Sequence, residues 1–126
     1  SSNTTRQIIS HPQRYVSGIH PDSLERVREG LIDVVANPQG TGYKTVRMKE
    51  ISIAGKTGTA ETGGGKNDHA WFAGFVPATR PKYAFAVVIE HGGSGSRVAG
   101  PVAQKLVRAM LDTGLLHPAT AKLQAN

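Results

Sequence analysis

The stretch ISIAGKTGTAETGGGKNDHAWFAGF, residues 51–75, decides how this chain folds, because it contains a Gly-Lys-Thr followed by further glycines. That tripeptide occurs in the phosphate-binding P-loop, Gly-x-x-x-x-Gly-Lys-Ser/Thr, which joins a strand to a helix. If Gly55 closed such a motif, its first glycine would be at position 50, which is Glu50. Residues 58–68 contain three consecutive glycines and no helical apolar period. The sequence therefore argues against a nucleotide site and predicts that a strand, not a helix, follows.

Three strands are predicted in and after this stretch. In residues 51–60, Ile51 and Ile53 alternate with smaller residues, which indicates one buried face. HAWFAGFV (residues 69–76) and YAFAVVIE (residues 83–90) are apolar on both faces, and the loop between them carries two prolines and reads as a hairpin connection. Strands that are apolar on both faces need cover on both sides of the sheet, so we expect these two to be central.

Two helices flank the strands. Residues 21–36 carry apolar side chains at helical spacing, begin with a proline suited to the first helical position, and are followed by Asn37-Pro38, which stops the helix. Residues 97–112 form a second apolar stripe, with Gly114 as its predicted C-cap. The order predicts an α+β fold with an antiparallel sheet of three or slightly more strands, packed with helices.

Composition narrows the possible functions. The 126 residues suit one domain, in which we expect residues 1–20 and 115–126 to be poorly structured. The net charge of +6 favours anionic partners, but the basic residues are scattered, so we expect ordinary solvated surface and no nucleic-acid partner. There is no cysteine, and no histidine pair has ligand spacing on a helix, so neither a metal nor another cofactor is expected.

No apolar run approaches the roughly 20 residues needed to span a bilayer, and no signal peptide is visible. If the protein is exported or anchored, we expect that segment to lie outside these residues.

A family resemblance rests on Lys56-Thr57-Gly58, extended to KTGTAE, together with three flanking segments in order. These are PDSLERVREGLIDVVANPQGTGYKTV before it, and HAWFAGFVPATRPKYAFAVVIEHGG and VAGPVAQKLVRAMLDTG after it. They resemble the class B penicillin-binding proteins, most closely the elongation-type penicillin-binding protein 2, which are D,D-transpeptidases that cross-link peptidoglycan. The similarity covers most of residues 21–114.

The resemblance implies roles for four residues. Thr57 and Thr59, which share one strand face, would bind the terminal carboxylate of a D-Ala-D-Ala peptide. Gly58 would keep the strand flat and let the ligand backbone approach, while the free strand edge would pair with the substrate. The N–H of Thr59 would form half of an oxyanion hole, and Lys56, on the opposite face, would supply positive potential and help in proton shuttling. Lys56 and Thr59 are thus the catalytic candidates.

Other polar residues near this strand have simpler explanations. Glu61 fits plain strand propensity, and His69 is expected to be a structural histidine at the start of a strand.

The sequence departs from the family at the nucleophile. The family's serine lies in Ser-x-x-Lys, but no serine here is followed by lysine three residues later. Ser1-Ser2-Asn3 matches a second family motif, Ser-x-Asn, only formally, because it lies too close to Lys56. We therefore expect a C-terminal portion of a transpeptidase domain that is inactive alone and forms no penicilloyl adduct.

The resemblance also implies partners and a location. They are peptidoglycan stem peptides and β-lactams in the full protein, and the missing N-terminal half of the domain. The full, membrane-anchored protein would work in cell-wall synthesis and cell shape, in the envelope at the extracytoplasmic face of the bacterial inner membrane. Sheet surfaces left uncovered would favour self-association.

Two alternatives remain open. A D,D-carboxypeptidase or serine β-lactamase shares the Lys-Thr-Gly strand, and the N-terminal architecture of the full gene would distinguish them. A non-enzymatic basic binding module is also possible, and salt-dependent binding to nucleic acid would support it.

Overall fold

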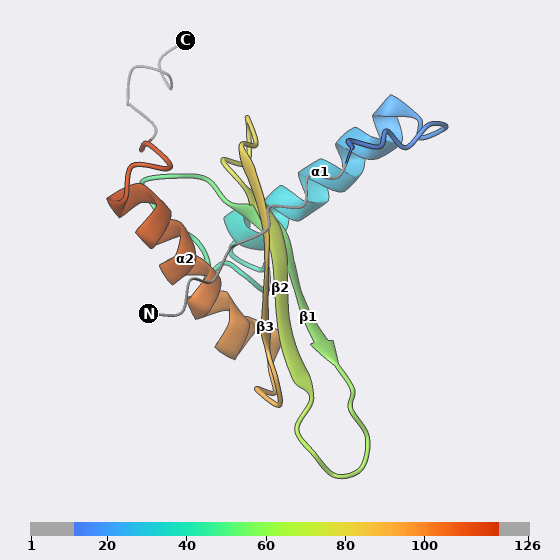
Figure 1. Ribbon diagram of the computed structural model, residues 1–126, viewed down its shortest axis with the longest axis vertical. Helices are drawn as coiled ribbons and strands as arrows, with labels where there is room; N and C mark the ends of the chain where they lie inside the picture. The colour runs from blue at the N-terminus through green and yellow to red at the C-terminus, as the bar shows by residue number, and fades with distance from the viewer. Residues whose placement is uncertain (1–11, 119–126) are drawn as a thin grey trace, which may run out of the picture.

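The computed structural model describes residues 12–118 and has the predicted order of elements (Figure 1). Helix α1 (Pro21–Ala36) precedes three strands, β1 (Ala54–Ala60), β2 (His69–Val76) and β3 (Tyr83–Ile89). A five-residue π-helical segment, η1 (Gly95–Ala99), leads directly into helix α2 (Gly100–Asp112). The α+β prediction is confirmed.

The strands form one antiparallel sheet in the order β1-β2-β3, so spatial order follows chain order as predicted. The register pairs Thr57 with Phe72, and Phe72 with Val87. β2 is central, but within residues 12–118 β3 has only one neighbour. The expectation that both apolar strands are central thus holds for β2 alone in the described part of the chain.

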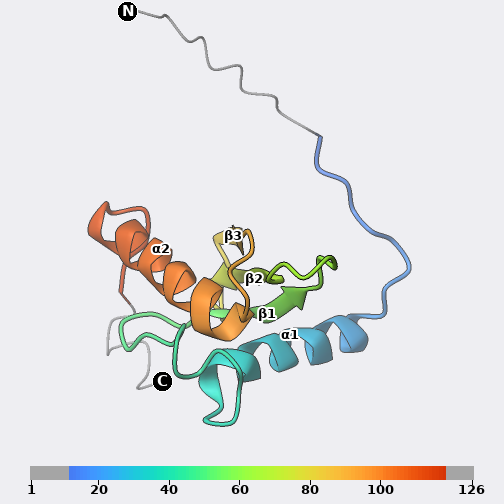
Figure 2. The same ribbon diagram turned by 90° about the horizontal axis from the view of Figure 1, so that it is seen from below.

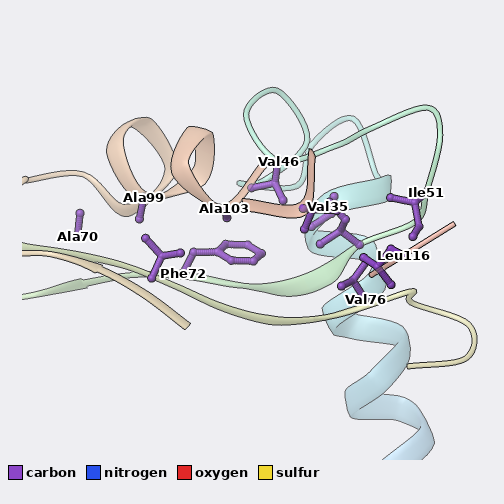
Figure 3. Packing of buried hydrophobic residues seen from close by; sticks show 12 residues of the cluster. Val35, Val46, Ile51, Ala70, Phe72, Val76, Ala99, Ala103 and Leu116 are labelled. Atoms are coloured by element: carbon purple, nitrogen blue, oxygen red, sulfur yellow. The ribbon is translucent and has the colours of Figure 1, made fainter. Parts of the chain in front are cut away.

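One side of the sheet, here called the inner face, carries the core. Phe72 and Val76 of β2 and Val87 of β3 are buried there. Ala103 and Val107 of α2 pack against them, and Figure 3 shows the phenylalanine ring lying beneath the helical segments. Small residues at the helix contact let α2 and η1 approach the sheet closely, which is why this face excludes water.

The opposite side, here called the outer face, is open in the described residues. Its exposed apolar side chains come from β2 and β3: Trp71, Ala73, Ala84, Ala86 and Val88. Helix α2 lies on the other side of the sheet, and α1 runs past the β1 edge (Figure 2). Within residues 12–118 only the inner face has a helical layer, so the cover that both faces need is incomplete and the outer face is left uncovered, as expected for part of a larger domain.

Element boundaries follow local signals closely. α1 begins at Pro21, where the His20 side chain accepts a hydrogen bond from the N–H of Asp22 at 3.2 Å. Gly114 ends α2 with a φ of 78°, and its N–H donates to the carbonyl of Leu111 at 3.2 Å. Ile53 is buried as predicted but precedes β1, which begins one residue later.

The expectation that residues 115–126 are poorly structured is wrong for Leu116. Leu116 falls in the segment expected to be poorly structured, yet it is only 1% exposed and belongs to the core. Its N–H donates to the carbonyl of Met110 at 3.0 Å, so the turn after α2 folds this leucine back onto the sheet. Residues 12–20 contain no helix or strand, while residues 1–11 and 119–126 lie outside the described residues.

Among the described residues, no helix combines the length and the apolar character that crossing a membrane requires.

Candidate active-site strand

The strand that carries residues 56–59 lies at one edge of the sheet. β1 pairs with β2 on one side only among the described residues, which confirms the predicted edge position. The other edge of β1 faces α1 and the loop that follows it. Gly55-Lys56-Thr57 lies within β1 rather than at the start of a helix, so the strand-to-helix geometry of a P-loop is absent here.

Side chains alternate along β1 as the strand period requires. Lys56 is exposed and shares the outer face with its partner Ala73, and its Nζ donates to the carbonyl of Thr57 at 2.8 Å. Thr57 lies on the inner face and is 8% exposed. A cavity of about 330 Å³ adjoins Lys56, between the C-terminal half of α1 and the loop after it.

Thr57 has a partner that lies far away in the sequence. The hydroxyl oxygens of Thr57 and Thr41 are 2.7 Å apart, which is a short O–H···O hydrogen bond. Thr41 belongs to the loop between α1 and β1, so this contact joins the loop to the candidate site.

The loop around Thr41 is fixed by its backbone. The N–H of Gly42 donates to the carbonyl of Val34 in α1 at 2.9 Å, and the N–H of Val46 donates back to Gly42 at 2.8 Å. A Cβ at Gly40 would overlap the carbonyl oxygen of Val34, so a glycine is required where the loop crosses the helix end. Thr41 is thus held on a rigid support rather than on a free turn.

Thr59 is supported in a similar way from the other side. Its Oγ1 accepts a hydrogen bond from the N–H of Gly95, at the start of η1, at 3.3 Å. A Cβ at Gly95 would overlap the carbonyl oxygen of Gly58, so η1 approaches the backbone of β1 as closely as a glycine allows. The inner side of residues 57–59 is therefore supported by the loop after α1 and by the start of η1, neither of which a local sequence pattern connects to β1.

Gly58 itself is not crowded by this chain. A Cβ there would meet the Cβ of Trp71 at 3.5 Å, which is ordinary van der Waals contact. The packing within residues 12–118 therefore does not require a glycine at this position.

His69 has a structural role, as expected. Its Nδ1 accepts from the N–H of His91 at 2.9 Å, and the Nδ1 of His91 lies 2.9 Å from the carbonyl oxygen of Asn67. These contacts join the start of β2 to the turn after β3. Glu61, which was set aside as a candidate, is exposed just beyond β1.

Glu50, the residue that argued against a P-loop, lies outside the candidate site. Its Oε1 accepts from the guanidinium of Arg108 in α2 at 2.9 Å. This hydrogen bond, with smaller help from the N–H of Glu50 itself, lowers the pKa of the Glu50 carboxyl below its ordinary value.

The residues predicted for the site lie together, while two supporting residues were missed. Lys56, Thr57, Gly58 and Thr59 are consecutive on β1. Thr41 and Gly95 were missed because a hydrogen bond between distant segments leaves no local pattern in a sequence. Within residues 12–118, no three histidine, aspartate or glutamate side chains gather in an arrangement that could hold a metal ion.

Comparisons with known proteins agree with this architecture. Residues 4–108 match the family described as penicillin binding protein transpeptidase domain. The peptidoglycan D,D-transpeptidase MrdA of Haemophilus influenzae is 34% identical over 105 residues, which cover 72% of this chain and 16% of that protein. The chain therefore spans less than a fifth of the length of this curated relative.

Two solved structures share the fold. Pseudomonas aeruginosa PBP2, in complex with WCK 5153, is 38% identical with a TM-score of 0.68, covering 88% of this chain and 23% of that one. Penicillin-binding protein A from M. tuberculosis, an imipenem acyl-enzyme complex, is 32% identical with a TM-score of 0.58, covering 74% of this chain and 20% of that one.

Proposed function

Because the chain belongs to the penicillin-binding protein transpeptidase domain family, in its class B, penicillin-binding protein 2 branch, we propose that it is the C-terminal portion of a peptidoglycan D,D-transpeptidase domain. One observation carries the proposal: residues 56–59 read Lys-Thr-Gly-Thr and lie on an edge strand that pairs with another strand on one side only within residues 12–118. Such an edge can take an extended peptide as an additional strand.

The reaction proceeds in two steps in the whole protein. A serine Oγ attacks the carbonyl of the penultimate D-Ala, the peptide C–N bond breaks, and the terminal D-Ala leaves with the proton while an ester forms on the serine. An acceptor amine then attacks this ester, a new amide forms, and the serine recovers its proton. This chain has no Ser-x-x-Lys, so the nucleophile belongs to the remainder of the domain.

This chain would supply the carboxylate-binding strand. Thr57 and Thr59 would donate hydrogen bonds to the terminal carboxylate of the stem peptide. Since the Thr59 oxygen already accepts from the N–H of Gly95, its own proton is available for a ligand. The open side of Gly58 would allow the ligand backbone to come close.

The catalytic candidates would act on the charges that develop during the reaction. The N–H of Thr59 would stabilise the oxyanion, which is worth roughly 3 kcal/mol of barrier for a single donor. The Lys56 ammonium would supply positive potential near the nucleophile and help in proton transfer.

We further propose the setting. Peptidoglycan stem peptides would be the substrates, and β-lactams, to which the imipenem complex of the M. tuberculosis relative points, would acylate the same serine. The site of action would be the cell envelope, at the outer face of the inner membrane. The outer face of the sheet would be covered by the rest of the transpeptidase domain.

The test compares the whole protein with the 126-residue chain, each incubated with a fluorescent penicillin and analysed by intact mass. We expect one adduct on the whole protein and none on the chain alone. In the whole protein, Thr59→Val should slow acylation about tenfold or more, because a hydrogen bond to a charged group is lost.

Three outcomes would contradict the proposal. An adduct on a serine of the isolated chain would refute the fragment interpretation, and an unlabelled whole protein would refute the activity. If the whole protein only released D-Ala or hydrolysed penicillin, without forming cross-links, a carboxypeptidase or β-lactamase would be indicated instead.

A further inference from the structure

The hydroxyl pair formed by Thr41 and Thr57 has a chemical consequence for ligand binding. A threonine hydroxyl has one proton to donate and can accept two hydrogen bonds. At 2.7 Å, one of the two oxygens donates and the other accepts. If Thr57 donates to Thr41, its proton is used; if Thr41 donates, the proton of Thr57 is free.

Only the second arrangement suits an anionic ligand. A carboxylate has no proton, so Thr57 can bind it only as a donor. Thr59 already has the matching arrangement, because its oxygen accepts from the N–H of Gly95. Two hydroxyls on one face of β1 would then each accept a hydrogen bond from the chain and donate one to the ligand.

The support of Thr41 explains how the two hydroxyl oxygens are kept at hydrogen-bonding distance. Gly42 is tied to the carbonyl of Val34 at the end of α1, and Gly40 lies against that same carbonyl with no room for a side chain. The loop thus fixes the position of the Thr41 oxygen relative to β1, and with it the rotamer of Thr57.

We propose that Thr41 is a positioning residue that donates its hydroxyl proton to Thr57 and so orients the Thr57 hydroxyl as a donor to the carboxylate of the ligand. This inference rests on the proposed function, because it takes the carboxylate of a stem peptide or β-lactam as the group that Thr57 binds. In this proposal Thr41 acts only through Thr57.

The experiment measures acylation rates of the whole protein with benzylpenicillin and with its methyl ester, which lacks the carboxylate. Thr41→Val keeps the shape of the side chain and removes the hydroxyl, whereas Thr41→Ser keeps the hydroxyl. Thr113→Val is the matched control, since that hydroxyl donates to the carbonyl of Ala109 at the end of α2, away from β1.

We expect Thr41→Val to slow acylation by benzylpenicillin about five- to tenfold, as for one lost hydrogen bond that orients a charged contact. The rate with the methyl ester should change little, and Thr41→Ser should restore most of the rate with benzylpenicillin. Thr57→Val should slow benzylpenicillin more, and the double variant should be no slower than Thr57→Val alone, because Thr41 acts through Thr57.

Equal losses for the acid and the ester would mean that Thr41 only supports the fold, and additive losses in the double variant would mean that it acts independently of Thr57. Either result, or an unchanged rate in Thr41→Val, overturns the inference while leaving the proposed function intact. A wild-type protein that benzylpenicillin does not acylate would overturn the proposed function, and the inference with it.

Discussion

The two faces of the sheet are built from the same strands but have opposite surroundings. On the inner face, Phe72 and Val87 are buried under α2 and η1. On the outer face, Trp71 is 39% exposed and Val88 is 42% exposed, with no helix of the described part over them. Apolar strand faces are stable against another layer, so this chain completes the inner face itself, and we expect a further layer to cover the outer face.

The approach of η1 to β1 should be the most sensitive point of the inner face. Gly95→Ala places a methyl group against the backbone of Gly58, so we expect a loss of about 3 kcal/mol in the free energy of unfolding. Gly58→Ala is the matched control, since its methyl meets only the Cβ of Trp71 at 3.5 Å. Urea unfolding of the 126-residue chain measures both.

In the whole protein, Gly58→Ala separates an effect on acylation from an effect on stability. It should lower acylation by benzylpenicillin while changing stability little, because its methyl projects from the open side of the strand. Equal destabilisation by the two alanines would show that the close approach of η1 is not what holds this part of the inner face.

Two neighbouring valines give a direct test of the two faces. Val87 is 8% exposed and Val88 is 42% exposed, and they are adjacent on β3 with opposite orientations. We expect Val87→Ala to lower the free energy of unfolding by about 2 kcal/mol, and Val88→Ala by less than about 1 kcal/mol in the isolated chain. In the whole protein, the loss of unfolding free energy caused by Val88→Ala should be larger if another part of the domain covers Val88. Equal costs in both proteins would contradict the idea that the outer face is an interface.

The open outer face should also promote association of the isolated chain, although the net charge of +6 makes the copies repel one another. We expect the mass from light scattering to rise with concentration, and Val88→Lys to reduce that rise. Val102→Lys is the control, because Val102 is 39% exposed on α2 and does not lie on the sheet. A chain that stays monomeric at high concentration would show that exposure of the outer face does not drive self-association.

The smallest effect concerns Glu50 and Arg108, which join the segment before β1 to α2. The pKa of Glu50 is lowered in the folded state, so its contribution to stability is present above the ordinary glutamate pKa and is lost as pH falls through the lowered value. Urea midpoints of wild type and Glu50→Gln, taken from neutral to acidic pH, should converge at low pH. Both groups are partly exposed, so added salt should shrink the difference at neutral pH; a difference that salt does not change would contradict an electrostatic origin.

The sequence by itself determined the elements and most of the candidate site. Apolar spacing and end signals predicted α1 and β2 with their observed limits, since helix and strand periods are local properties. The motif at residues 56–59 was found through its resemblance to a known family, which rests on consecutive residues, and strand alternation predicted the opposite orientations of Lys56 and Thr57.

The tertiary structure decided which residues support that motif and which sheet face is covered. Thr41 and Gly95 reach β1 only after the chain has folded back on itself, so their hydrogen bonds to Thr57 and Thr59 could not be read from neighbouring residues. Likewise, the strands are apolar on both faces, and their pattern does not say which face α2 will take. The burial of Leu116 has the same cause, because a turn after α2 brings that side chain back to the core.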